Sequence, residues 1–272
     1  MAKRHLLSLL CILCLTSCSH VDVDDRLIYV EPPVVEPVQE DDTITIKPSV
    51  LIEDFTGQRC VNCPTAAEEI QRLKTQYGDS TIVAVGIHSG PLAVFPTDKA
   101  VGLRTQQGDD YYQHWNIDAE PAGHINRNGN ISTPDLWQTQ VRSALSQPAN
   151  VSLRATSHYD ADTRSLAIQV EIFSKITLTG HLQIWLTESD IIALQMMPNG
   201  KANRDYVHNH VFRTAVNGAW GDPCSLSEKE TKTLSFTATI DQQWTPENLS
   251  VVAFLYNDTG VLQVTEKHLK IP

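Results

Sequence analysis

The sequence predicts an α/β domain that is followed by an all-β domain of the sandwich type. Two observations predict this fold class. Between residues 43 and 148, short apolar runs typical of buried strands alternate with segments whose apolar residues recur at the helical period. From residue 149 to residue 272 the apolar residues instead recur at every second position, and no long helical segment interrupts them. The change of period predicts a domain boundary at 148–149.

In the first domain we expect two strands, a helix, a third strand, a polar segment with helical stretches, a hairpin and a last helix. TITIKP alternates, while VLIEDF and TIVAVGIHSG are apolar runs of the kind that buried strands show. An Asn-Gly pair predicts the hairpin turn, and Thr133 followed by Pro134 is a typical helix start. The expected ranges are strands at 43–48, 50–55 and 81–90, helices at 65–78 and 133–147, and the hairpin at 121–131.

The second domain is predicted to contain seven short strands. Turn residues separate them at nearly regular spacing, which is typical of an immunoglobulin-like β-sandwich of about a hundred residues. The expected strands are 151–159, 165–173, 181–189, 210–216, 233–240, 249–257 and 261–269.

Residues 1–17 have the features of a secretory signal peptide. A basic start is followed by an apolar run and then by small residues, and the run is too short to span a bilayer. The ending L-T-S-C resembles the lipobox of bacterial lipoproteins, which implies that Cys18 is acylated and becomes the mature N-terminus. An ordinary signal peptide that ends near a cysteine is the alternative. Residues 18–42 are acidic and proline-rich, which predicts an extended spacer.

Composition and charge limit the classes of partner. The chain has 272 residues, of which 41% are hydrophobic and 19% are charged, as in globular proteins. The formal net charge of -11 argues against nucleic acid as a partner, because binding to phosphates requires basic groups. No run of about 18 apolar residues follows the signal peptide. The expected contact with a membrane is therefore the lipid anchor at Cys18.

Three of the six cysteines lie in or directly after the signal peptide, which leaves Cys60, Cys63 and Cys224 in the mature domains. The pair Cys60 and Cys63 could be half of a zinc site, a structural disulfide or a redox centre. A zinc site needs about four ligands. The other candidates are Cys224 and the pair His208 and His210, all in the second domain. We therefore expect no metal and no other cofactor, although a metal at the two histidines remains an alternative.

Cys60 and Cys63 stand where a buried strand gives way to a helix. A thiol at a helix N-terminus faces unsatisfied N–H groups that lower its pKa, and Arg59 adds a positive charge beside it. The first cysteine of such a pair is the exposed one. Cys60 is therefore expected to attack a substrate disulfide and Cys63 to resolve the mixed disulfide. A permanent, unreactive bridge is the alternative, although closing so short a loop adds little chain-entropy stabilisation.

The order of buried strand, C-x-x-C, helix and a later proline before a strand resembles the thioredoxin-like fold over residues 43–148. The resemblance implies that Asp54, six positions before Cys60, is a buried acid that takes a proton from the resolving thiol. It also implies that Pro121 is the cis-proline that packs against the disulfide and binds substrate backbone. Glu120 departs from the pattern, because a carboxylate at this position would disfavour a nearby thiolate unless Arg59 pairs with it.

Over the whole chain, the lipobox, VLIEDFTGQRCVNCPTA and HNHVFRTAVNGAWGD resemble the twenty-eight-kilodalton outer-membrane lipoprotein family of Bacteroidota. The resemblance implies a surface-exposed antigen of the outer membrane with a receptor or adhesin role. Two functions follow as hypotheses. One is a thiol–disulfide oxidoreductase that acts on protein thiols and disulfides. The other is a non-enzymatic binding protein for host proteins, in which the Cys60–Cys63 bridge is structural.

Overall fold

The computed structural model describes residues 45–271 of the chain. The predicted signal peptide, the lipidated Cys18 and the spacer at 18–42 lie outside the described residues. Within them, no helix is both long and apolar enough to cross a bilayer.

The first part of the described chain contains three strands and three helices. The alternating segment before β1 forms no strand over 45–49, so the prediction at 43–48 is wrong for its described part. Ser49 instead donates through its hydroxyl to the backbone oxygen of Val264 at 2.5 Å. The elements are β1 (Val50–Thr56), α1 (Cys63–Tyr77), β2 (Ile82–His88), α2 (Gln106–His114), β3 (Ala122–Ile125) and α3 (Pro134–Leu145).

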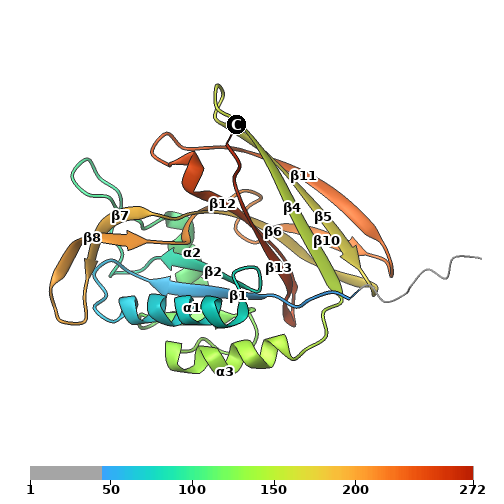
Figure 1. Ribbon diagram of the computed structural model, residues 1–272, viewed down its shortest axis with the longest axis horizontal. Helices are drawn as coiled ribbons and strands as arrows, with labels where there is room; N and C mark the ends of the chain where they lie inside the picture. Colours follow the sequence, from blue (N-terminus) through green and yellow to red (C-terminus); the bar gives the residue numbers. More distant parts are fainter. Residues whose placement is uncertain (1–44, 272) are drawn as a thin grey trace, which may run out of the picture. The chain divides into compact units, whose positions relative to one another are not determined.

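The three strands pair as one unit. β1 runs parallel to β2, with Asp54 opposite Gly86, and antiparallel to β3. The predicted hairpin at 121–131 is only partly present. β3 pairs with β1, and its pairing with the chain that follows consists of a single antiparallel bridge between Gly123 and Ser132. α1 and α3 cover one face of β1 and β2, where they share a hydrophobic core with Ile52 (Figure 1).

The second part of the described chain is almost entirely β-structure. All seven predicted strands are present, and three further strands, β7, β8 and β10, were missed. Cys224 lies in β10, where it is buried and forms no disulfide with another cysteine of residues 45–271. The strands are β4 (Val151–Asp160), β5 (Ser165–Ser174), β6 (Leu178–Glu188), β7 (Ile191–Met196), β8 (Ala202–His208), β9 (Val211–Ala215), β10 (Asp222–Leu226), β11 (Thr231–Thr239), β12 (Leu249–Asn257) and β13 (Gly260–His268).

Strands from both sides of the predicted boundary at 148–149 join in one mixed sheet. Its order is β13-β12-β6-β9-β2-β1-β3, with β10 on β6. The junction is the short parallel pairing of Gly86 with Val211, and Gly86 donates its backbone N–H to the oxygen of His210 at 2.8 Å. Leu51 of β1 and Trp185 of β6 also share one core. The boundary thus marks a change of pattern in the sequence, while the described residues 45–271 form one compact unit.

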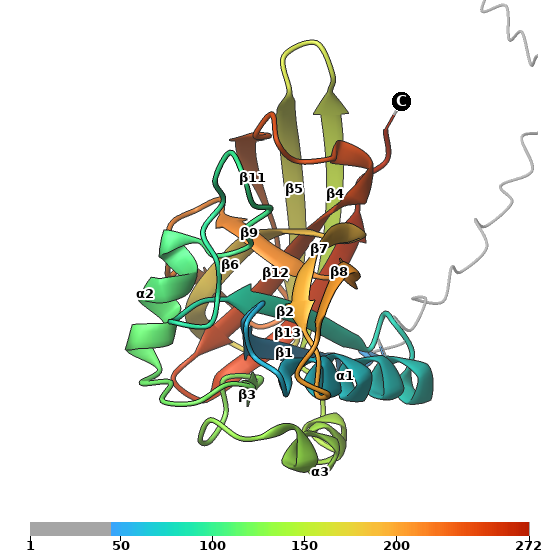
Figure 2. The ribbon, with the colours of Figure 1, turned by 90° about the vertical axis from the view of Figure 1, so that its left-hand side faces the viewer.

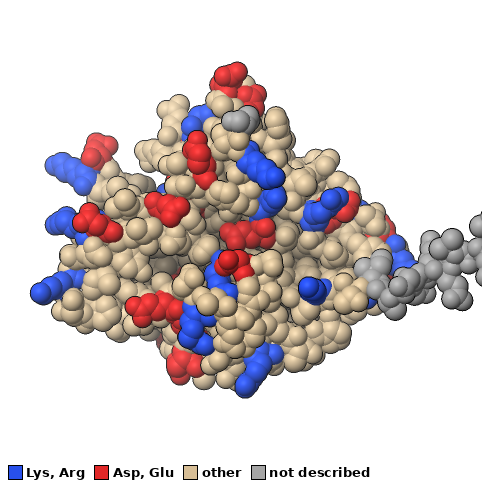
Figure 3. Space-filling model, in the orientation of Figure 1, with Lys and Arg blue, Asp and Glu red and all other residues tan. Residues whose placement is uncertain are grey.

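A second sheet packs against the β6–β12 part of the first. It has the order β11-β5-β4, and its inward residues, such as Val170, share a core with Leu186 and Val251 of the large sheet. The described chain is therefore mostly β, with mixed sheets and a sandwich-like second half. On the face seen in Figure 3, acidic and basic side chains are interspersed rather than gathered by sign.

β7 and β8 form a hairpin of their own and pair with no other strand. We call residues 191–208 the β7–β8 hairpin. Its turn includes Gly200, whose φ of 76° is in the left-handed region that favours glycine. Figure 2 shows the hairpin beside the N-terminal end of α1, where the two cysteines lie. The hairpin therefore belongs to the surroundings of the candidate site.

Candidate functional site

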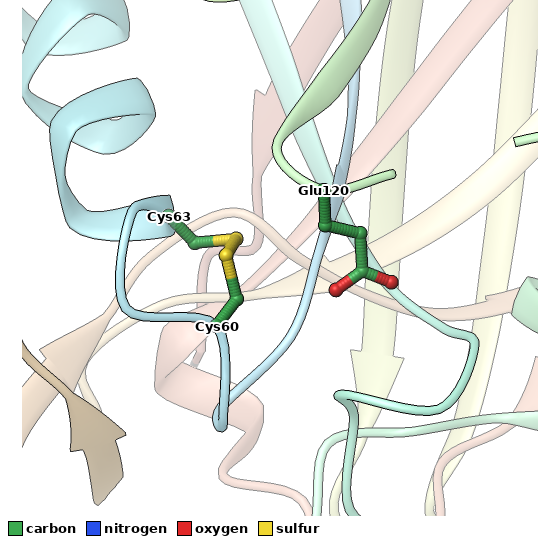
Figure 4. A group of neighbouring side chains, drawn as sticks. All are labelled: Cys60, Cys63 and Glu120. Carbon is green, nitrogen blue, oxygen red and sulfur yellow. A yellow bond between two sulfur atoms is a disulfide. The ribbon is translucent and has the colours of Figure 1, made fainter. Parts of the chain in front are cut away.

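The cysteine pair lies at the N-terminal end of α1, as predicted. Cys63 is the first residue of the helix, and Pro64 follows in its first turn. Cys60 lies in the preceding turn, where its N–H donates to the oxygen of Gly57 at 3.0 Å. A disulfide joins Cys60 and Cys63, whose Cα atoms are 5.4 Å apart (Figure 4). The local sequence thus produces the expected strand, turn and helix.

The prediction that Cys60 is the exposed member of the pair is wrong. Cys60 and Cys63 are each only 3% exposed. The β7–β8 hairpin covers them, because Gln195 donates its side-chain N–H₂ to the oxygens of Cys60 (2.8 Å) and Gly57 (3.3 Å). Met196 adds a backbone N–H to the oxygen of Gln58 at 2.8 Å. Gln195 is 135 residues further along the chain than Cys60, so the sequence pattern around the cysteines gives no sign that the hairpin covers them.

Gln58 holds the turn before the cysteines in place. Its side chain is buried, and its Nε2 donates to the oxygens of Val101 (2.9 Å) and Leu194 (3.3 Å). Its Oε1 accepts the N–H of Leu103 at 3.1 Å. One side chain thus ties the cysteine turn both to the loop before α2 and to the hairpin. Sequence analysis missed Gln58, because a glutamine next to a C-x-x-C pair carries no distinctive signal.

Asp54 is buried in β1, as the resemblance to the thioredoxin-like fold implies. It is 5% exposed, and its Oδ1 has no hydrogen-bond partner. Burial raises the pKa of this carboxyl to about 8, and the charge of Glu120 adds to the rise. At neutral pH Asp54 therefore mostly carries a proton. Asp54 and Cys63 line the same cavity of about 270 Å³, together with Gln195.

Glu120 faces the disulfide from the loop before β3 (Figure 4). The Glu120–Pro121 peptide bond is cis. One carboxylate oxygen of Glu120 and the two sulfur atoms lie within 4.8 Å of one another, the only such group of three or more metal-ligating atoms among residues 45–271. Both carboxylate oxygens are buried and have no hydrogen-bond partner. Burial raises the pKa of Glu120 to about 7, while the positive charge of Arg104 opposes the rise.

The cation proposed as a partner for Glu120, Arg59, does not pair with it. Arg59 is exposed, and no ion pair of Glu120 is present in the described part of the chain. A positive charge that acts on Glu120 comes from Arg104, which is itself paired with Asp109 at 2.9 Å. The carboxyl of Glu120 therefore lies next to the sulfur atoms without a direct counter-ion.

Two further histidines lie beside the same cavity. The rings of His88 and His208 meet edge to face, with centroids 5.2 Å apart, and both line the cavity. Burial lowers the pKa of His88 well below its usual value and that of His208 to about 4, so both rings are neutral at pH 7. His210 has different neighbours, because its Nε2 accepts from Lys74 Nζ at 3.2 Å. His210 nevertheless lines the same cavity as His208. Within residues 45–271, neither histidine belongs to a group of three or more potential metal ligands, and the alternative metal pair stays a prediction.

Comparisons with known proteins point to a family. Residues 108–271 match the model of the family described as outer membrane protein Omp28. Among solved structures, the chain is similar to HBP35 of Porphyromonas gingivalis, with 14% identity, a TM-score of 0.65, and coverage of 82% of this chain and 76% of that one. At this identity the likeness concerns the fold alone. None of the curated proteins matches the chain.

Two further solved structures are similar over shorter stretches. A domain of the outer membrane lipoprotein Omp28 from Porphyromonas gingivalis is 24% identical, and the match covers 45% of this chain and 97% of that one with a TM-score of 0.33. Spo0M, a sporulation control protein from Bacillus subtilis, is 12% identical, with coverage of 44% and 48% and a TM-score of 0.33. TM-scores this low carry no argument.

Proposed function

Because the chain belongs to the Omp28 family of outer membrane proteins, we propose that it is an outer-membrane lipoprotein with a thioredoxin-like site for thiol–disulfide exchange. The family match covers more than half of the chain and includes Pro121, but it begins after Asp54, Cys60 and Cys63. The outer-membrane location thus follows from the family, while the chemistry is argued from the geometry of the site. The anchor in the proposal is the acylated Cys18, which would expose the domains at the cell surface.

The fold proposed for residues 43–148 is thioredoxin-like, and that for 149–272 is an immunoglobulin-like sandwich. The parallel pairing of β1 with β2, the antiparallel β3 and the flanking α1 and α3 support the first assignment. The fold likeness to HBP35 over 82% of the chain supports the combination of the two.

One observation carries the proposed chemistry: the buried Asp54 lines the same cavity as Cys63, at the first turn of α1. A buried carboxyl without a hydrogen-bond partner is unfavourable for folding, so its position beside the resolving thiol is better explained by proton transfer than by stability. Pro121 follows Glu120, whose carboxylate lies close to both sulfur atoms, and in this proposal it binds substrate backbone.

The reaction starts from the dithiol form, which a dithiol reductant generates. The Cys60 thiolate attacks a substrate disulfide, forms a mixed disulfide and releases the first substrate thiolate, which takes a proton from water. Asp54 accepts the proton of Cys63 in its ionised form, which is the minor form at neutral pH because the pKa of this carboxyl is raised to about 8. The Cys63 thiolate then attacks the sulfur of Cys60 and releases the second substrate thiolate, which takes the proton from Asp54. The substrate gains two electrons, and the Cys60–Cys63 disulfide forms again.

Exchange requires the β7–β8 hairpin to move, because Cys60 and Cys63 are each only 3% exposed and a nucleophile cannot reach their sulfur atoms. The bonds from Gln195 and Met196 to the cysteine turn hold the hairpin closed. A substrate segment could donate its own hydrogen bonds to the backbone oxygens that Gln195 and Met196 now contact. It would then displace the hairpin and bind beside Pro121 in one step.

Trapping tests the proposal. A Cys63→Ser variant, reduced and mixed with a disulfide-containing protein, should accumulate a mixed disulfide at Cys60, which non-reducing electrophoresis and mass spectrometry detect. The Cys60→Ser/Cys63→Ser variant is the control. A second measurement is the reduction potential in glutathione buffers, where a value between about -120 and -270 mV is expected. Absence of the mixed disulfide together with a potential below about -300 mV would overturn the proposal.

The burial of both cysteines favours a second candidate function, a non-enzymatic binding protein in which the Cys60–Cys63 bridge is structural. The proposed partners are then host proteins at the cell surface. In this case the folded Cys60→Ser/Cys63→Ser variant should bind host matrix as well as the unmodified protein does. Loss of that binding in a folded double variant would argue against it.

A further inference from the structure

We propose that reduction of the Cys60–Cys63 disulfide turns Cys60, Cys63 and Glu120 into a binding site for a thiophilic divalent cation of the Zn²⁺ type. The three side chains offer two sulfur atoms and one carboxylate oxygen that all lie within 4.8 Å of one another. Figure 4 shows the Glu120 carboxylate on the side of the disulfide that faces the loop before β3. The inference goes beyond thiol–disulfide exchange, since a protein can bind a metal here without transferring electrons.

The first argument is the orphaned carboxylate. Both oxygens of Glu120 are buried and accept no hydrogen bond, although buried polar groups in proteins are nearly always partnered. Two neighbouring glycines leave room for the carboxylate, because they have no Cβ atoms. A Cβ on Gly57 would come within 2.7 Å of its Oε2, and one on Gly90 within 3.0 Å of its Oε1. A cation at this position would give Glu120 the partner that the disulfide form lacks.

The second argument is the donor chemistry. Thiolates select Zn²⁺ and similar soft or borderline ions over Mg²⁺ and Ca²⁺, and a carboxylate completes many such sites. In a tetrahedral zinc site the sulfur atoms would stand about 3.8 Å apart, given Zn–S bonds of about 2.3 Å. Breaking the disulfide permits this separation within the same turn. Three protein ligands leave the fourth position to water or to an incoming thiol.

The third argument is charge. Two thiolates and one carboxylate carry three negative charges, so that a divalent ion leaves the site with a net charge of -1. The positive charge of Arg104 also acts on Glu120, although Arg104 is paired with Asp109 at 2.9 Å. Without a cation, two thiolates beside a buried carboxylate would repel one another in a medium of low dielectric constant.

The binding step balances as follows. A trialkylphosphine supplies two electrons and is oxidised to the phosphine oxide with the oxygen of one water molecule. The disulfide breaks, and the two protons of that water make Cys60 and Cys63 thiols. Zn²⁺ then displaces the two thiol protons and the proton of Glu120, so that three protons leave and two Zn–S bonds and one Zn–O bond form. The oxidised protein lacks free thiols and should not bind the ion here.

The test is a metal titration of the full-length protein after reduction with a phosphine under anaerobic conditions. Calorimetry with Zn²⁺, and the thiolate-to-metal absorption that Co²⁺ produces, should each show one equivalent bound by the reduced protein and none at this site in the oxidised protein. Glu120→Gln should weaken Zn²⁺ binding at least tenfold, whereas Asp118→Asn, an exposed acid two positions away, should not. Cys60→Ser/Cys63→Ser should abolish the Co²⁺ absorption.

Two results would overturn the proposal. One is a reduced protein that binds no Zn²⁺. The other is a folded Glu120→Gln variant that binds it as tightly as the unmodified protein, because the two thiols would then act alone. Circular dichroism of the oxidised Glu120→Gln protein verifies its fold. The outcome is separate from that of the trapping experiment, since the Cys63→Ser trap needs no metal and metal binding needs no substrate disulfide.

Discussion

At the scale of single residues, the candidate site is defined by acids that lack partners. Asp54 lines a cavity together with Cys63, and Glu120 lies within 4.8 Å of both sulfur atoms. Within residues 45–271, Asp54 Oδ1 and both carboxylate oxygens of Glu120 are buried without a hydrogen-bond partner. Asp54 could be predicted from the resemblance to the thioredoxin-like fold, in which a buried acid lies at this position before the first cysteine. Glu120 was noticed only as a departure, because its approach to the sulfur atoms depends on the fold of the loop before β3. From the sequence, only Cys60 and Cys63 could therefore be counted as potential metal ligands at this site.

The pKa of Asp54 predicts an unusual dependence of stability on pH. The carboxyl has a folded-state pKa of about 8, above its ordinary value of 3.8, so the folded protein holds more protons than the unfolded chain between these values. The free energy of unfolding should therefore fall as pH rises from about 4 to 8, by about 1.4 kcal/mol per unit at most. Its full contribution is present below pH 4.

Asp54→Asn should remove most of this slope. The amide cannot ionise, so the variant should be more stable than the unmodified protein at pH 8, by on the order of 2–4 kcal/mol. Glu120, whose pKa is raised to about 7, should leave a residual slope in the variant below pH 7. Urea unfolding at a series of pH values measures both curves. Parallel curves for the two proteins would show that Asp54 ionises in the folded state as freely as in water.

Arg127 and Glu53 form a buried ion pair whose loss should be costly. Their side chains are 3% and 0% exposed and meet at 2.8 Å. The guanidinium also lies 4.6 Å from the centre of the Tyr256 ring. Arg127→Met should destabilise the fold by about 3–5 kcal/mol, because it leaves the Glu53 carboxylate buried without a partner.

The matched control is the Arg127→Met/Glu53→Gln double variant, which removes both charges. Denaturant titration should find it more stable than Arg127→Met alone, since the unpaired charge is gone. If the double variant loses at least as much stability as the single one, the cost lies in the contacts of Arg127 with the aromatic rings rather than in the buried charge.

At the scale of elements, the β7–β8 hairpin is the part of the site that sequence analysis missed. Its turn contains Asn199 followed by Gly200, the same signal that was used at 128–129. The flanking segments were less easily identified, because β7 is apolar at nearly every position and β8 is mostly polar. The strands next to the cysteines follow from local period, but the segment that covers them is determined by long-range packing.

Weakening this cover should make the disulfide easier to reduce. Gln195→Ala removes the hydrogen bonds to the oxygens of Cys60 and Gly57. Each such bond contributes about 0.5–1.5 kcal/mol, so the open state of the hairpin should be populated roughly tenfold more. The rate of reduction by glutathione, followed by mass spectrometry of alkylated thiols, should rise by a similar factor.

The control for this measurement is Ile192→Ala, which is also in β7. The side chain of Ile192 is apolar and 61% exposed, so its removal breaks no hydrogen bond to the cysteine turn. It should leave the rate within about twofold of the unmodified protein, as surface substitutions change stability little. Equal rates for Gln195→Ala and Ile192→Ala would mean that the hairpin does not limit access to the disulfide.

At the scale of the whole molecule, helices and strands alternate before 148–149, and almost only strands follow. The conclusion that two domains stand apart does not follow. Pairing of β2 with β9 cannot be predicted from period, because Gly86 and Val211 are 125 positions apart and the contact is a single pair. The core that the two segments share cannot be predicted either. The apolar sequence of a strand such as β1 indicates that its residues are buried, but not which other residues they pack against.

This shared core predicts that the first half cannot fold alone. In a fragment of residues 45–148, the face of β1 and β2 that carries Leu51 and Val85 would lose Trp185 and Phe254, with which it is packed in the intact chain. Burial of a large apolar side chain is worth about 1.5–3 kcal/mol, and several such contacts would be lost in a domain of only marginal stability. The fragment should therefore show no cooperative thermal transition by circular dichroism and little dispersion in its amide proton NMR spectrum.

Residues 45–272 should unfold in one transition, with fluorescence and circular dichroism coinciding. A fragment that melts cooperatively would instead show that the two segments are independent domains joined through Gly86 and Val211, in which case opening of the β7–β8 hairpin would be coupled to separation of the two domains.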